Sequence, residues 1–123
     1  MNENFIIPCE HFEDDALAAI KKLFSHKPYP DALFCINDAS AITAIKYLNK
    51  KGIRIPEEVA VIGFNNDPIS EVVEPSLTTI MLPCYEIGNM AVEMLIKRIN
   101  DYSIPAETIK LHSKLIKRDS SKK

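Results

Sequence analysis

Residues 32–67 read ALFCINDASAITAIKYLNKKGIRIPEEVAVIGFNND, and the order of apolar and polar residues in this stretch decides the fold. Residues 32–36 and 59–64 are continuous apolar runs of strand length, which is typical of buried strands with both faces covered. Between them, residues 39–51 place apolar side chains at helical spacing, and Gly52 follows where a left-handed helix cap is expected. A strand, a helix and a strand in this order close as a right-handed βαβ unit, so we expect a parallel sheet.

Further elements are predicted on both sides of this unit. Asp14 begins an amphipathic helix that ends before a proline-rich turn. Residues 77–82 form a third apolar run, residues 85–99 a long amphipathic helix, and residues 109–115 alternate as a half-exposed edge strand does. The polar residues 119–123 are predicted to be a disordered tail. The predicted fold class is therefore α/β, with a parallel sheet flanked by helices.

The composition is that of one soluble globular domain, with 123 residues, 46% of them hydrophobic and 26% charged, and a formal net charge of -2. A slightly acidic chain argues against a domain-wide surface for nucleic acid or anionic lipid. No apolar run reaches the roughly 18 residues of a membrane span, and the first residues lack the pattern of a secretion signal. We therefore expect a cytoplasmic protein with no membrane partner. Its cysteines, Cys9, Cys35 and Cys84, are spaced too widely for a disulfide framework and are expected to be reduced.

The sequence does not predict an enzyme. The three glycines lie too far apart for a phosphate-binding loop, and Ser40 lacks the flanking glycines of a nucleophile elbow. The three histidines are isolated along the chain rather than paired at metal-ligand spacing. We therefore predict no catalytic residue, no metal ligand and no cofactor. A basic group near the C-terminus is expected to lie on a solvated strand and tail. It consists of Lys114, Lys117, Arg118, Lys122 and Lys123.

Polar residues follow each strand of the βαβ unit at the point where the strand ends. Asn37 and Asp38 follow the first strand, and Asn65, Asn66 and Asp67 follow the second. The carboxyl ends of parallel strands meet at one edge, where ligands bind, and short carboxylate and amide side chains suit a polyhydroxylated ligand. A helix cap at Asn37 or Asp38 and a simple turn after the second strand account for the same residues, so both alternatives stay open.

Four segments, in the right order and at the right separations, resemble those of LacI/GalR-type bacterial transcription regulators. They are PDALFCIND at residues 30–38, GIRIPEEVAVIGFNN at 52–66, PSLTTI at 75–80 and LIKRDSS at 115–121. The resemblance runs from Asp14 to Ser121 and corresponds to about the C-terminal third of such a regulator. It implies a periplasmic-binding-protein-like (type I) C-terminal subdomain, in truncated form. Operator DNA would be bound only by a helix-turn-helix domain that is absent from this chain.

The resemblance also implies domain boundaries. Residues 1–67 would belong to the C-terminal effector subdomain, residues 68–76 would form a crossover loop between subdomains, and residues 77–103 would belong to the other subdomain. Residues 108–118 would return as a strand. The helix within residues 77–103 would lack the sheet that it covers in the family, and its exposed apolar face would favour self-association. That face consists of Ile87, Ala91, Met94 and Leu95.

The family's functional residues are carried over where the motifs match. Asp38 matches the acidic position that contacts the ligand, beside Asn37, and residues 65–67 match the polar cluster after the second strand. Leu82 departs from the family, because many relatives have a polar residue there, often glutamine. The apolar leucine would remove one hydrogen bond to the effector. The helix at residues 39–51 matches the element through which these regulators commonly dimerise. Its candidate interface residues, for which burial in the core is the alternative, are Ile42, Ile45, Tyr47 and Leu48.

The functional prediction is therefore a non-enzymatic region that binds a small effector, a sugar or a related metabolite, and that dimerises. Ligand binding would control DNA binding in a LacI/GalR-type regulator. The alternative is a fragment of a sugar-binding protein that serves transport or chemosensing.

Overall fold

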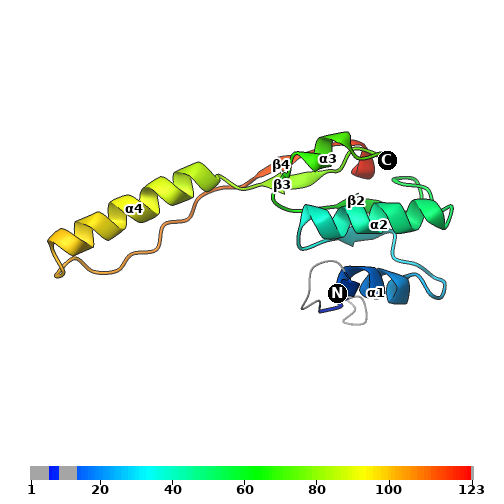
Figure 1. Cartoon of the computed structure of the whole chain (residues 1–123), viewed down its shortest axis with the longest axis horizontal. Coiled ribbons are helices and arrows are strands. Elements are labelled where there is room, and N and C mark those ends of the chain that lie inside the picture. The colour runs from blue at the N-terminus through cyan, green and yellow to red at the C-terminus, as the bar shows by residue number, and fades with distance from the viewer. Residues whose placement is uncertain (1–5, 9–13, 123) are drawn as a thin grey trace. The chain divides into compact units, whose positions relative to one another are not determined.

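The structure is a computed structural model that describes residues 6–8 and 14–122, and it divides into two compact units (Figure 1). Unit 1 comprises the residues up to Met81 together with those from Leu115 onward, and unit 2 comprises residues 82–114. This division differs from the predicted segment 77–103, because residues 77–81 pair with the sheet of unit 1. The elements are α1 (Asp14–Leu23), β1 (Ala32–Phe34), α2 (Asp38–Lys50), β2 (Ala60–Ile62), α3 (Ile69–Val72), β3 (Thr79–Met81), α4 (Cys84–Asn100), β4 (Lys114–Ile116) and the 3-10 turn η2 (Asp119–Ser121).

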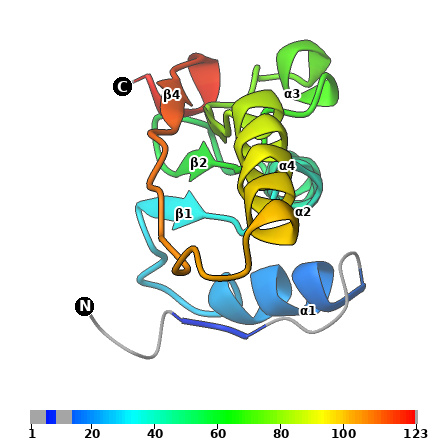
Figure 2. The ribbon, with the colours of Figure 1, turned by 90° about the vertical axis from the view of Figure 1, so that its left-hand side faces the viewer.

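β1 and β2 lie side by side (Figure 2). They form a parallel pair in which Leu33 lies opposite Val61. The pairing continues past the strand ends, because the Cys35 N–H donates to the Ile62 carbonyl at 2.8 Å. On its other side, β2 meets the segment that leads into β3 through an isolated parallel bridge between Ile62 and Thr78. β3 in turn pairs with β4. β2 is therefore an inner strand, paired on both sides, and the predicted parallel βαβ unit is confirmed.

The hydrophobic core of unit 1 is built by α1, α2 and the sheet. α1 packs against α2, and α2 packs against β2. Ile42, Ile45 and Leu48 of α2 are 8%, 1% and 0% exposed and belong to this core. Their assignment to a dimer interface is wrong, because their side chains are already buried in their own chain. Of the four interface candidates, Tyr47 alone is partly exposed.

β1 is buried on one face, although the apolar run predicts cover on both. Cys35 is buried in the core, whereas Phe34 and Ile36 on the opposite face are 61% and 71% exposed. α1 and α2 both contribute to the core on the Cys35 side, so within the described residues the other face stays in solvent. An apolar run shows that both faces suit burial, but the tertiary arrangement decides which face is covered.

Both ends of α2 have the caps that the sequence predicts. The Asn37 Oδ1 accepts a hydrogen bond from the Ser40 N–H at 2.8 Å, which satisfies an N–H at the start of the helix. At the other end Gly52 has a φ of +70°, and the Ile53 N–H donates to the Leu48 carbonyl at 3.0 Å. This is the left-handed cap with a bond back into the last turn. α2 is therefore fixed in length by its own sequence.

Unit 2 consists mainly of α4, which is amphipathic in sequence yet has no buried residue. Ile87 and Leu95 are 45% and 60% exposed, so the apolar face that was predicted to lack a partner is exposed in the described chain. The predicted strand at residues 108–118 is shorter than expected, since β4 covers only its C-terminal part. Within the described residues, no helix is long and apolar enough to span a bilayer.

The C-terminal residues form η2 against unit 1 rather than a disordered tail. Ser120 is 0% exposed, and its Oγ accepts from the Thr78 N–H at 2.9 Å and donates to the Val61 carbonyl at 2.6 Å. The disorder prediction is therefore wrong for residues 119–122, and Lys123 lies outside the described residues. Polar composition favours a tail in solvent, but here a hydroxyl is needed to satisfy two buried backbone groups.

Candidate functional site

The polar residues that follow β1 and β2 lie together at the carboxyl end of the sheet. The Asp38 N–H donates to the Phe64 carbonyl at 3.0 Å, and the Asp38 Oδ2 accepts from the Asp67 N–H at 2.7 Å. The structure thus brings Asp38 into contact with the segment after β2, as the parallel order of the strands requires.

Asp38 is buried, and both of its carboxylate oxygens are bonded within the chain. It is 0% exposed, and its Oδ1 accepts from the Thr79 Oγ1 at 2.6 Å while its Oδ2 accepts from the Asp67 N–H. A carboxylate removed from water needs such bonds, because an unpaired buried charge is strongly unfavourable. Asp38 therefore ties together the start of α2, the segment after β2 and the start of β3.

Gly63 and Thr79 complete this arrangement, and sequence reasoning missed both. A Cβ atom at Gly63 would overlap the Asp38 Oδ1 and would lie 3.0 Å from the Leu77 Cδ2, so only glycine leaves room for the carboxylate. Thr79 bonds to Asp38 from 41 residues away. Neither residue stands out locally, since Gly63 lies within an apolar run and Thr79 lies at the start of a strand.

Asn65 and Asn66 both adopt left-handed backbone conformations, with φ values of 107° and 57°. Such conformations cost about 1–3 kcal/mol outside glycine, and asparagine tolerates them better than most residues. The Asn65 N–H donates to the Ile80 carbonyl at 2.9 Å, and the Asn66 N–H donates to the Thr79 Oγ1 at 3.2 Å. These bonds hold a bend that leaves the Asn65 side chain exposed and Asp67 half-buried.

Asn37, the fifth candidate, is 9% exposed and uses its Oδ1 as the cap of α2. The cap that the sequence left open as an alternative is therefore confirmed for Asn37. Its contact with a ligand stays a prediction.

Arg118 is a residue that sequence reasoning placed wrongly. Its side chain is only 13% exposed, whereas a solvated surface position was expected. The Nη1 donates to the Ser70 Oγ at 3.0 Å and to the Leu77 carbonyl at 2.9 Å. The Nη2 donates to the Asn66 Oδ1 and to the Glu71 Oε1, each at 2.9 Å. Its position in the LIKRDSS segment is the one feature of the sequence that marks it.

Asp119 fixes the start of η2. Its Oδ2 accepts from the Ser76 Oγ at 2.7 Å, and its Oδ1 accepts from the Lys122 Nζ at 3.1 Å. Hydrogen bonds from the Ser76 hydroxyl, which has the larger effect, and from the Lys122 ammonium hold the pKa of Asp119 below its ordinary value. The carboxylate therefore stays ionised near neutral pH and holds η2 beside the segment that leads into β3.

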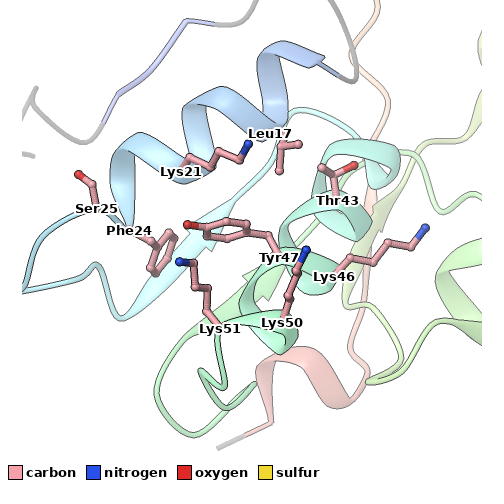
Figure 3. A pocket seen from close by; sticks show the side chains of 9 residues that line it. All are labelled: Leu17, Lys21, Phe24, Ser25, Thr43, Lys46, Tyr47, Lys50 and Lys51. Atoms are coloured by element: carbon pink, nitrogen blue, oxygen red, sulfur yellow. The ribbon is translucent and has the colours of Figure 1, made fainter.

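A groove between α1 and α2 lies apart from these residues (Figure 3). Its volume is about 850 Å³, and Tyr47 is one of the residues that line it. The centroid of the Tyr47 ring lies 5.8 Å from the Lys51 Nζ. Among the residues that the structure describes, four lysines and no carboxylate line the groove, so two copies that met through it would bring like charges together, which is unfavourable. The assignment of Tyr47 to an interface stays a prediction. The four lysines are Lys21, Lys46, Lys50 and Lys51.

The candidate site offers carboxylate, amide, hydroxyl and guanidinium groups. In residues 6–8 and 14–122, no group of three or more His, Cys, Asp or Glu side chains is placed to hold a metal ion. Cys35 is buried and Cys84 is exposed, while Cys9 lies outside the described residues. The groups at the candidate site can donate and accept hydrogen bonds.

A parallel α/β unit with hydrogen-bonding side chains at the carboxyl ends of its strands has the architecture in which small molecules are bound at that edge of the sheet. A family model described as a periplasmic binding protein-like domain matches residues 2–121, and the chain belongs to this family.

The chain is 36% identical over 123 residues to the HTH-type transcriptional repressor PurR of Vibrio vulnificus. The match covers 100% of this chain and 37% of that protein. The structure of a transcriptional regulator CelR–cellobiose complex is 27% identical, with a TM-score of 0.90, and the match covers 98% of this chain and 37% of that one. A LacI family transcriptional regulator from Enterococcus faecium with bound ribose is 27% identical, with a TM-score of 0.78, and the match covers 93% and 42%.

These relatives are transcriptional repressors and regulators rather than enzymes, as the sequence predicts. The similarity to a LacI family regulator and to a PurR repressor agrees with the resemblance seen in the four motifs of this chain. The chain spans about 37% of the length of the curated relative that it matches.

Proposed function

We propose that this chain supplies part of the effector site of a transcription regulator and that the effector is a sugar or a related polyhydroxylated metabolite. The observation that carries the proposal is the tie from Asp38 to the Asp67 N–H and the Thr79 hydroxyl. It fixes a polar bend at the carboxyl end of a parallel sheet, where ligands bind in this architecture.

Within this proposal, Asn65 and Asp67 contact the ligand, and Asp38 positions them. The Asn65 amide is exposed and both donates and accepts, while the Asp67 carboxylate accepts from neighbouring hydroxyls. Asp38 is buried and already bonded, so its part is to hold the Asp67 backbone. The bound cellobiose and ribose in two similar structures support a sugar as the ligand class.

Titration of the 15N-labelled chain with D-ribose, and separately with cellobiose, tests this site by NMR. We expect saturable shifts of the amides at residues 65–67, with a Kd of about 1 mM or weaker, because a few exposed hydrogen bonds supply little free energy. Asn65→Gly removes the amide while glycine adopts the φ of 107° without strain. It should weaken binding roughly threefold to tenfold, the worth of one hydrogen bond.

The matched control is Asn89→Ala, which removes an exposed amide from α4 and should leave both titrations unchanged. Asp38→Ala is a poorer test, since it also breaks bonds inside unit 1. If neither sugar shifts residues 65–67, or if Asn65→Gly binds as the unchanged chain does, the sugar site is placed wrongly.

The same proposal extends to regulation. Units 1 and 2 would belong to two subdomains joined by crossing segments, and ligand binding would shift them between two arrangements. That shift would alter how paired DNA-binding modules, supplied by sequence outside this chain, meet operator DNA in the cytoplasm. Self-association would pass through the exposed apolar face of α4.

A second candidate is a solute-binding protein for transport or chemosensing, which the periplasmic binding protein-like family description favours. The reading frame upstream of Met1 separates the two. A helix-turn-helix there supports the regulator, and a secretion signal there supports the solute-binding protein.

A further inference from the structure

We propose that Arg118 is the positioning residue of the candidate site and that it acts on the segment at residues 65–67 through the Asn66 side chain. Its effect on ligand binding rests on the proposed function, whereas its effect on the order of this segment does not.

The guanidinium joins parts of the chain that are far apart in sequence. Arg118 follows β4, yet its Nη2 lies 2.9 Å from the Asn66 Oδ1, 52 residues away. The Arg118 backbone is held as well, because its N–H donates to the Thr78 Oγ1 at 2.8 Å and its carbonyl accepts from the same hydroxyl at 3.0 Å. The Arg118 guanidinium therefore reaches Asn66 from a backbone that is itself held by hydrogen bonds.

Asn66 needs such an anchor. Residues 65 and 66 are both left-handed, and conformations of this kind persist only where their surroundings hold them. Three of the hydrogen bonds that hold the bend are donated by the backbone N–H groups of residues 65–67. Their acceptors are on Ile80, Thr79 and Asp38. The Arg118 bond holds a side chain of the bend, so it sets where the Asn66 amide points and resists rotation of the segment.

Lysine cannot replace this geometry. The two terminal nitrogens of Arg118 reach four acceptors, on Ser70, Leu77, Asn66 and Glu71. A lysine ammonium is a single point with three donors, so it cannot serve both sides of a planar fork. The Glu71 carboxylate is 67% exposed, so its ion pair adds little by itself. Of the four acceptors, Asn66 is the one that lies within the segment at residues 65–67.

Amide hydrogen exchange on the full 123-residue chain tests the proposal through a double-mutant cycle. Arg118→Lys should lower the protection of the Asp67 amide at least about tenfold, the usual worth of a hydrogen bond to a charged group. In the Asn66→Gly background, where the acceptor is missing and the backbone is unstrained, the same substitution should change that protection by less than about twofold.

A general loss of stability would act equally in both backgrounds, so an equal fold-change overturns the proposal. The proposal is also overturned if the protection of the Asp67 amide differs by less than about twofold between Arg118→Lys and the unchanged chain. The control is Lys117→Ala, an exposed neighbour, which should leave residues 65–67 unaffected.

Titration of the same variants with D-ribose separates this inference from the proposed function. Arg118→Lys should weaken ribose binding at least about threefold. If the unchanged chain binds no ribose but the exchange cycle behaves as expected, the sugar proposal fails and the positioning role of Arg118 stands.

Discussion

Asp38 shows how one buried side chain organises the candidate site. Its two oxygens receive a hydroxyl from Thr79 and a backbone N–H from Asp67, and Gly63 leaves the space that the carboxylate fills. Packing around this group is tight, so the arrangement depends as much on the missing side chain at position 63 as on the carboxylate. A core packed at this density does not absorb an added methyl group without movement.

Gly63→Ala should lower the free energy of unfolding by about 1–3 kcal/mol, because the new methyl group overlaps the Asp38 carboxylate. Gly88→Ala is the matched control, since nothing lies within 4 Å of the added Cβ in α4. This control should be neutral or stabilising by up to about 1 kcal/mol, the helix preference of alanine over glycine. Urea denaturation followed by circular dichroism gives both values. Equal midpoints for the two variants would contradict the tight packing at Gly63.

η2 is only three residues long, yet it supplies buried hydrogen bonds to unit 1. Its Ser120 is buried and bridges the Thr78 N–H and the Val61 carbonyl, so the turn closes hydrogen bonds that the sheet itself leaves open. The same turn follows Arg118, which reaches the bend after β2. The C-terminal turn is therefore part of the scaffold that holds the candidate site.

Ser120→Ala should lower the free energy of unfolding by about 1–3 kcal/mol, because it leaves a buried N–H without a partner. Ser103→Ala, which removes an exposed hydroxyl bonded to Asp101, should change it by less than about 0.5 kcal/mol. The measurement is the midpoint of urea unfolding at constant m value. A Ser120→Ala midpoint as high as that of Ser103→Ala would show that η2 is not integral to unit 1.

At the scale of the whole molecule, the two units differ in how well they bury apolar surface. Unit 1 has a core of fully buried side chains, whereas α4 in unit 2 buries none. The exposed apolar side chains of α4 include Ile87, Leu95 and Ile99. A helix with such a face gains free energy by covering it, so contact between copies is expected.

The average mass of the chain in light scattering should therefore rise with concentration above that of one chain. Leu95→Glu places a charge on the exposed apolar face of α4 and should return the mass to that of a monomer. Lys97→Gln changes the net charge by the same amount at an exposed position of α4 and should leave association unchanged. A monomeric mass for the unchanged chain at all concentrations would remove this surface as a site of association.

Local patterns in the sequence determined the elements of the βαβ unit and their order. The apolar runs ending in polar residues, the Asn37 cap and Gly52 predict β1, α2 and β2 correctly, because each depends on residues close together in the chain. The parallel order then predicts that Asp38 and residues 65–67 meet, as they do.

The tertiary structure alone decided which groups are satisfied within the chain and which are left exposed. Polarity indicates solvent for Arg118 and Ser120, yet both are held by bonds to residues 40 or more positions away. Apolar character indicates burial for Phe34 and Ile36, yet both are exposed. The physical reason is the same in each case: a side chain's own chemistry sets what partner it needs, and only the folded arrangement of distant segments determines whether that partner is within reach.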